Sequence, residues 1–113
     1  MPYIAVNTSQ KLSDAQKDKI KAELGRLIAV IPTKSEVVTM VDISDARTIY
    51  KAGEKIDGAF VDLRLYKKSE FGAKKKYTEE IFGLLSGELG IKNENVYINI
   101  FELETWGADG TLK

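Results

Sequence analysis

A strand–helix–strand pattern occurs twice along the chain, at similar spacing in each half. In the first half, residues 2–8 (PYIAVNT) alternate with a period of two, which predicts a half-buried strand. Ser13 and Gln16 have the spacing of a capping box, and Pro32 ends the predicted helix because a proline pushes the preceding residue out of the α region. The apolar stripe of this helix is formed by Ile20, Leu24, Leu27 and Ile31. Residues 36–43 (EVVTMVDI) are the second predicted strand.

The second half repeats this order after a long connection, residues 44–58, which is rich in turn residues and has room for a short strand at its centre. Residues 59–66 (AFVDLRLY) alternate again and predict a strand. A helix is expected from a cap at Ser69 to a stop at Gly90. Its apolar stripe consists of Tyr77, Ile81, Leu84, Leu85 and Leu89. Residues 95–103 (NVYINIFEL) are the last main strand, and the turn-rich tail has room for one short strand more.

These elements predict an α+β fold made of two β-α-β repeats. Each crossover should be right-handed, which makes the two strands of each repeat parallel. We therefore expect a four-stranded mixed sheet with both helices on one face, in a single domain of residues 1–113. The other face combines large apolar residues (Met40, Phe60, Tyr66, Tyr97, Phe101) with polar ones (Asp42, Asp62, Arg64, Asn99). This face is too apolar to be left exposed to water and too polar to form a dry core. It therefore predicts that several chains assemble around a partly hydrated interior.

The composition excludes several classes of function. Seventeen basic residues balance seventeen acidic ones, so the formal net charge is zero. Nucleic acid or an anionic membrane as the main partner usually requires a basic excess, and we expect neither. No apolar run is long enough to span a bilayer, and the N-terminus lacks the pattern of a secretory signal peptide. We expect a cytoplasmic protein, although unconventional secretion would leave no trace in the sequence.

The chain contains neither cysteine nor histidine. This removes thiol nucleophiles, histidine-based triads and Cys/His zinc sites, and we expect no metal and no cofactor. It also removes the side chain whose ordinary pKa lies nearest to neutrality. An α-amino group titrates at about 7.7–8.0, closer to neutrality than any side chain that remains. Removal of Met1 would make the secondary amine of Pro2 such a group, and Pro2 is our candidate base.

The predicted topology brings two further residues towards Pro2. Parallel strands start at the same edge of a sheet, so Lys34, just before the second strand, should lie near the start of the first. If the second repeat runs antiparallel to the first, the third strand ends at that edge with Tyr66. A neighbouring cation and burial both lower the pKa of an amine, which would leave Pro2 neutral near pH 7 and able to act as a general base.

Four segments together resemble the tautomerase superfamily, and within it the branch of macrophage migration inhibitory factor and D-dopachrome tautomerase. They are MPYIAVNT, TKSEVVTMVDI, GLLSGELGIKNENVYINIFE and the WG…G tail. The resemblance covers nearly the whole chain, and its most specific parts are the N-terminal proline and VYIN at residues 96–99.

The resemblance implies a homotrimer whose sheets wrap a central channel, with three active sites between subunits. It also implies a tautomerase or isomerase that interconverts keto and enol forms of an α-keto acid such as phenylpyruvate. Pro2 would be the base, Lys34 and Tyr66 would lie in the same subunit's pocket, and Tyr97 and Asn99 would come from the neighbour. Trp106 would form part of the pocket wall and help to exclude water.

The chain also departs from the family pattern. AFVDL at residues 59–63 stands where vertebrate members have Cys-x-x-Cys, so no thiol redox activity is expected. Tyr66 stands at a usually aliphatic position, and Ala108 replaces a second aromatic residue of the bacterial tail, which changes the size of the expected pocket.

Three alternatives stay open on the sequence. One is a superfamily decarboxylase or hydratase that uses protonated Pro2, with Arg64 as the carboxylate binder; otherwise Arg64 is expected to pair with Asp42 or Asp62. Another is a non-enzymatic, cytokine-like signalling protein. The third is a small structural domain without a pocket, which a monomer in solution would favour.

Overall fold

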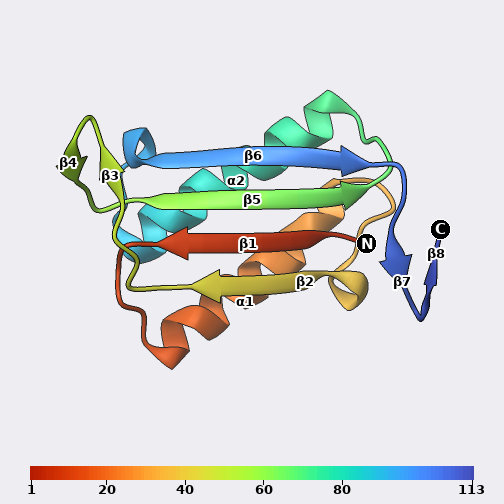
Figure 1. Ribbon diagram of the computed structural model, residues 1–113, viewed down its shortest axis with the longest axis horizontal. Helices are drawn as coiled ribbons and strands as arrows, with labels where there is room; N and C mark the ends of the chain where they lie inside the picture. Colours follow the sequence, from red (N-terminus) through yellow and green to blue (C-terminus); the bar gives the residue numbers. More distant parts are fainter.

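The two repeats form one four-stranded sheet with the strand order β2–β1–β5–β6, in a computed structural model that describes residues 1–113 (Figure 1). The strands are β1 (Tyr3–Thr8), β2 (Met40–Ser44), β5 (Ala59–Tyr66) and β6 (Val96–Leu103). β1 and β2 are parallel, β5 and β6 are parallel, and β1 runs antiparallel to β5. The predicted mixed sheet and its topology are confirmed.

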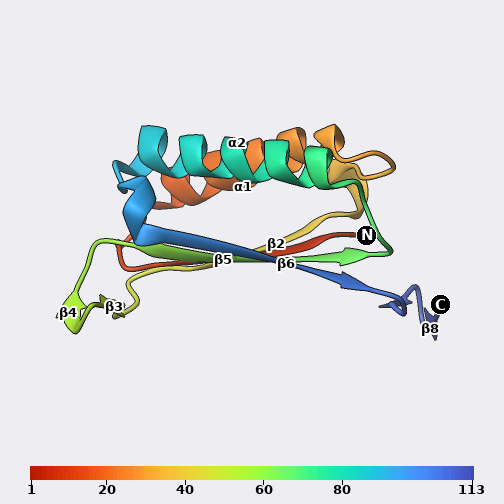
Figure 2. The same ribbon diagram turned by 90° about the horizontal axis from the view of Figure 1, so that it is seen from above.

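Both helices cover the same face of the sheet (Figure 2). They are α1 (Asp14–Leu27), which continues into the 3-10 turn η1 (Ile28–Val30), and α2 (Phe71–Leu89). The predicted capping box of Ser13 and Gln16 is present at the start of α1. Between the helices and the sheet lies a core of 18 buried apolar residues, among them Ile4, Val61, Leu63, Ile20 and Ile81. Neither helix is both long and apolar enough to cross a lipid bilayer.

The buried phenol of Tyr77 joins the two helices inside this core. Its hydroxyl donates a 2.8 Å hydrogen bond to the carbonyl of Leu24 in α1, and burial raises the pKa of this phenol. A buried hydroxyl needs such a partner, because an unsatisfied polar group in the core costs free energy.

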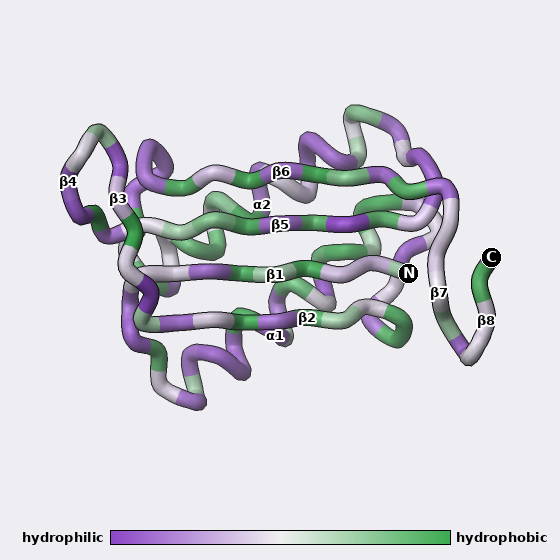
Figure 3. The backbone as a smooth tube through the Cα atoms, in the orientation of Figure 1, coloured by the Kyte–Doolittle hydropathy of each residue, from purple (hydrophilic) through white to green (hydrophobic).

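The opposite face of the sheet has no covering layer within the chain (Figure 2). Along β5 the side chains alternate between buried and accessible, as the period of two predicts, and Figure 3 shows hydrophobic and hydrophilic residues following one another along the strands. Large apolar side chains on this open face, including Met40, Phe60, Tyr97 and Phe101, are 39% to 66% exposed.

The predicted strand 36–43 is wrong at its start. Residues Glu36–Val38 form the 3-10 turn η2, and β2 begins only at Met40. The reason is that the parallel ladder starts where Tyr3 pairs with Met40, so the residues before Met40 have no strand beside them. The β-branched side chain of Val37 favours a strand by local propensity, but in the structure this residue is 93% exposed and has no strand beside it.

The predicted cap of the second helix is wrong by one residue. Glu70 is the N-cap, and α2 starts at Phe71. Ser69 lies one residue before the cap, and its backbone N–H donates to the carboxylate of Glu102 at 2.6 Å, a partner 33 positions away that local sequence cannot reveal. The predicted stop at Gly90 is confirmed, with a left-handed backbone at φ 66°.

Short hairpins extend the chain beyond both ends of the sheet, on the side away from the helices (Figure 2). β3 (Tyr50–Lys51) pairs with β4 (Glu54–Lys55) inside the long connection. β7 (Gly107–Ala108) pairs with β8 (Thr111–Leu112) in the tail, where Asp109 and Gly110 both have positive φ, as a type I′ turn requires. The β7–β8 hairpin and both chain termini lie at one end of the sheet (Figure 1).

We expect Tyr77→Phe to lower the free energy of unfolding by about 1 kcal/mol, the usual net contribution of one hydrogen bond. Tyr50→Phe is the matched control, because Tyr50 is 64% exposed and the loss of its hydroxyl should leave the free energy of unfolding almost unchanged. Urea unfolding at equal protein concentration measures both. Equal effects of the two changes would contradict a stabilising role of the bond between Tyr77 and Leu24.

Candidate functional site

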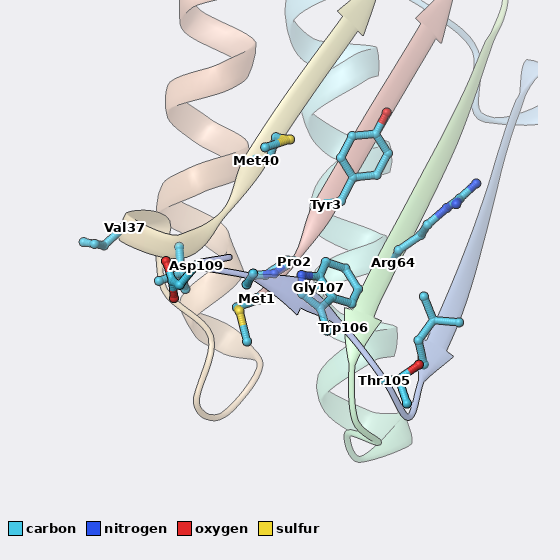
Figure 4. Close-up of a pocket in the computed structure, with 13 residues that line it drawn as sticks. Met1, Pro2, Tyr3, Val37, Met40, Arg64, Thr105, Trp106, Gly107 and Asp109 are labelled. Atoms are coloured by element: carbon cyan, nitrogen blue, oxygen red, sulfur yellow. The ribbon is translucent and has the colours of Figure 1, made fainter. Parts of the chain in front are cut away.

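A cavity of about 720 Å³ lies where β1 begins, between η2 and the β7–β8 hairpin (Figure 4). Eight of its 13 lining residues are hydrophobic, so the cavity suits a ligand with an apolar body. Its walls include Met1, Pro2, Val37, Met40 and Trp106.

Pro2 is buried, and its backbone is held in place by the sheet. The N–H of Met40 donates to the Pro2 carbonyl at 3.0 Å, one residue before the parallel ladder begins. In the chain as it stands, the Pro2 nitrogen belongs to the Met1–Pro2 peptide bond and is not basic. Cleavage of that bond would create an amine at the cavity wall.

The pKa of the Met1 amine reports the electrostatic environment at this wall of the cavity. Burial lowers the pKa of the Met1 amine below its ordinary value, and the cations of Lys34 and Lys113 lower it further. Desolvation and neighbouring positive charge both favour the neutral form of an amine. An amine here is therefore more often neutral, and able to accept a proton, than one in water.

Lys34 lies at the same end of the sheet, in the loop before η2. Its Nζ donates to the backbone carbonyl of Tyr66 at 2.9 Å, which fixes the ammonium against the end of β5. Burial lowers the pKa of Lys34, while the carboxylate of Glu102 opposes this shift. The structure thus brings Pro2, Lys34 and Tyr66 to one end of the sheet, but of these three only Pro2 lines the cavity.

Trp106 stands at the base of the β7–β8 hairpin. Its backbone N–H and carbonyl pair with those of Lys113 at 2.9 and 3.0 Å, and its indole contributes to the cavity wall. The Tyr66 ring lies behind it, with the ring centroids 6.4 Å apart at a tilt of 52°. Tyr66 supports the wall rather than lining the cavity.

Tyr97 and Asn99 are not brought to this cavity. They pair with Phe60 and Asp62 along β6, whereas the residue that follows Pro2 pairs with Arg64, nearer the other end of β5. Both side chains lie on the open face. The Oδ1 atoms of Asn99 and Asp62 are buried there without a hydrogen-bond partner. Within one chain, the expected site is incomplete.

Arg64 has the aspartate partner that the sequence predicted. Its guanidinium contacts the carboxylate of Asp62 at 3.3 Å, and Figure 4 shows it directed away from Pro2. Asp42 instead accepts a 2.7 Å hydrogen bond from the hydroxyl of Tyr3. Arg64 thus lines the same cavity as Pro2 but is paired with Asp62 and points away from Pro2.

Sequence reasoning missed several cavity residues. Val37 and Val38 were placed in a strand, Met40 was assigned only to the open face of the sheet, and Leu103 and Asp109 were not considered for the site. The Asp-Gly pair of the tail is a typical hairpin signal and could have indicated that the tail folds back over the sheet edge. No group of three or more acidic side chains comes together in a way that could hold a metal ion.

Comparisons with known proteins give one family and a single fold. A family model described as macrophage migration inhibitory factor (MIF) matches residues 1–112. The crystal structure of Leishmania major MIF2 is similar with a TM-score of 0.92 at 24% identity, covering 100% of this chain and 97% of that one. The macrophage migration inhibitory factor-like protein of Entamoeba histolytica gives 0.87 at 19% identity, covering 99% and 98%. No curated protein sequence matches.

A third similar structure is that of Pt0534 inactivated by 2-oxo-3-pentynoate. It has a TM-score of 0.84 at 11% identity and covers 96% of this chain and 93% of that one. At these identities the three structures establish the fold alone.

We expect Lys34→Gln to raise the pKa of the terminal amine, because a neighbouring cation that disfavours protonation is lost. The pKa should remain below its ordinary value, since burial is the larger cause and is retained. The pH dependence of acylation of the terminal amine, followed by mass spectrometry, measures the shift. Lys11→Gln is the control, because Lys11 is exposed and is not among the charges that act on the amine. An equal shift in both variants would show that Lys34 has no specific effect.

Proposed function

This chain belongs to the macrophage migration inhibitory factor family, and from this membership we propose that it is a tautomerase that interconverts keto and enol forms of a 2-oxo acid such as phenylpyruvate. The observation that carries the proposal is the amine at the start of β1. In the chain with Met1 this amine lies at the wall of a mostly apolar cavity, and the pKa of the Met1 amine is lowered by burial and, further, by Lys34 and Lys113. The inactivation of the similarly folded Pt0534 by 2-oxo-3-pentynoate, itself a 2-oxo acid, supports the substrate class.

The proposed catalyst is the mature chain, in which Met1 has been removed and Pro2 carries a neutral secondary amine. This amine takes a proton from the carbon next to the keto group. The electron pair of the broken C–H bond forms the C=C bond, and the carbonyl pair moves to oxygen. The protonated Pro2 then returns the proton to that oxygen, which yields the enol, and the reverse sequence gives the keto acid. Atoms and charge balance without a cofactor.

Lys34 stabilises the charges on the substrate. A substrate carboxylate and a developing enolate oxygen are both negative, and a partly buried ammonium interacts with them more strongly than one in water. The bond from Lys34 to the Tyr66 carbonyl holds the ammonium in a fixed place, so little reorganisation is needed during the reaction. Trp106, backed by Tyr66, keeps water away from one side of the cavity.

The active form in this proposal is a homotrimer in which Tyr97 and Asn99 complete the site of a neighbouring subunit. The open face supports assembly, because large apolar side chains such as Tyr97 and Met40 are more than half exposed in one chain.

We expect Pro2→Gly to lower kcat/KM for ketonisation of phenylpyruvate enol by about 10²-fold or more, the usual contribution of a positioned base. Ultraviolet absorbance between pH 5 and 9 follows the reaction. Wild-type activity should rise with pH through one ionisation below about 7.7, because only the neutral amine accepts a proton. A Pro2→Gly variant with wild-type activity, or an active protein that keeps Met1, would refute Pro2 as the base.

Subunit mixing tests the shared site. Pro2→Gly and Asn99→Ala should each have low activity alone, and joint unfolding and refolding of the two should restore part of it. Mixed trimers then contain sites in which an intact Pro2 faces an intact Asn99. The control is the double variant refolded together with wild type. The activity of this mixture should not exceed that of the wild-type subunits that it contains. A monomer by analytical ultracentrifugation, or no recovery on mixing, would contradict the shared site.

A further inference from the structure

Asp109 is the only acidic residue that lines the cavity beside Pro2. Its carboxylate takes part in none of the six ion pairs of the chain. The cavity's other charged side chain, Arg64, is paired with Asp62 and directed away from Pro2 (Figure 4). Asp109 therefore supplies a negative charge to the cavity without a partner in the chain.

The fold holds Asp109 in place without needing its charge. Asp109 and Gly110 form the turn of the β7–β8 hairpin, with φ values of 54° and 83°. The base of the hairpin is tied by the two bonds between Trp106 and Lys113. Asparagine suits the first position of an Asp-Gly type I′ turn as well as aspartate does, so the turn alone does not require a carboxylate.

The charges around the cavity are arranged asymmetrically. The charges that act on the terminal amine are the cations of Lys34 and Lys113, and Asp109 is not one of them. Asp109 lies instead at the tip of the hairpin, on the side of the cavity where Figure 4 places Val37 and on the far side of Pro2 from Arg64. Lys34 does not line the cavity, but its cation acts on the amine at the cavity wall, whereas Asp109 is part of the wall. A ligand carboxylate is therefore attracted towards the end at the amine and repelled from Asp109, which favours one orientation in the cavity.

We propose that Asp109 makes this site select 2-oxo acids by the charge at the end remote from the oxo group, favouring a positively charged group and rejecting a second anion. The orientation rests on the proposed tautomerase function, in which Lys34 holds the substrate carboxylate. The remote end of the ligand then lies towards the hairpin. A cationic group there pairs with Asp109, and an anionic group meets a like charge.

The expected preference is modest, because Asp109 is exposed to solvent. Exposed ion pairs contribute about 1 kcal/mol or less, which corresponds to a factor of about five. The preference should weaken as salt rises, since the Debye length is only about 10 Å at 0.1 M ionic strength.

The test compares phenylpyruvate with 4-(aminomethyl)phenylpyruvate and 4-carboxyphenylpyruvate. For each substrate, kcat/KM is expressed relative to that for phenylpyruvate. This ratio for the cationic substrate should be about fivefold higher in wild type than in Asp109→Asn. The ratio for the anionic substrate should be lower in wild type than in Asp109→Asn. Asp109→Asn keeps the shape of the side chain and the turn. Glu104→Gln is the matched control, because it removes the same charge from an exposed residue that does not line the cavity, and its ratios should equal those of wild type.

A binding measurement separates this inference from the proposed reaction. The probes are 3-phenylpropanoate and its 4-(aminomethyl) derivative, which cannot tautomerise, and their Kd values are measured by NMR titration. A preference for the cationic probe that is lost in Asp109→Asn upholds the inference even if wild type fails to turn over phenylpyruvate. Ratios that are the same in wild type and Asp109→Asn, or that shift equally in Glu104→Gln, overturn the inference even if phenylpyruvate is turned over.

Discussion

The parallel pairing of β1 with β2 is the interaction on which the site depends. It begins where the N–H of Met40 meets the Pro2 carbonyl, and it aligns Tyr3 with Met40 at the edge of the sheet. The first residues of the chain, which are usually poorly ordered in proteins, are thereby fixed against a cavity. The right-handed crossover through α1 then returns the chain to the same edge, which is why Lys34 lies close enough to act on the amine.

In the proposed reaction, the lack of histidine leaves the terminal amine as the group that titrates nearest to neutrality. A histidine could titrate near neutrality with no special environment, but an amine needs its pKa lowered to be neutral at pH 7. For the Met1 amine, burial and like charge supply that shift, and both have a cost in stability because Lys34 is itself partly desolvated. The hydrogen bond from Lys34 to the Tyr66 carbonyl offsets part of this cost, so the same contact supports the fold and positions the charge.

Most of the fold could be predicted from periodicity. Alternation in residues 59–66 and the apolar stripe of α2 depend on contacts between each element and one core, so the pattern is visible in the local sequence. The start of β2 and the cap of α2 could not be predicted this way, because they depend on distant partners. β2 can begin only where β1 offers a partner, and Glu102 takes the N–H of Ser69 from the far strand β6.

The residues of the candidate site also divide into those that strand topology predicts and those that it does not. Topology alone placed Pro2, Lys34 and Tyr66 at one edge, because strand direction determines where strand ends lie. The apolar wall at Val37 and the acidic wall at Asp109 come from a 3-10 turn and a short hairpin, neither of which has a periodic signal. Such segments have no core contacts to maintain, so their side chains can vary while the sheet and the amine stay the same. The residues proposed to select the ligand therefore lie where the sequence pattern is weakest, and the residues proposed to perform the chemistry lie where strand topology is strict.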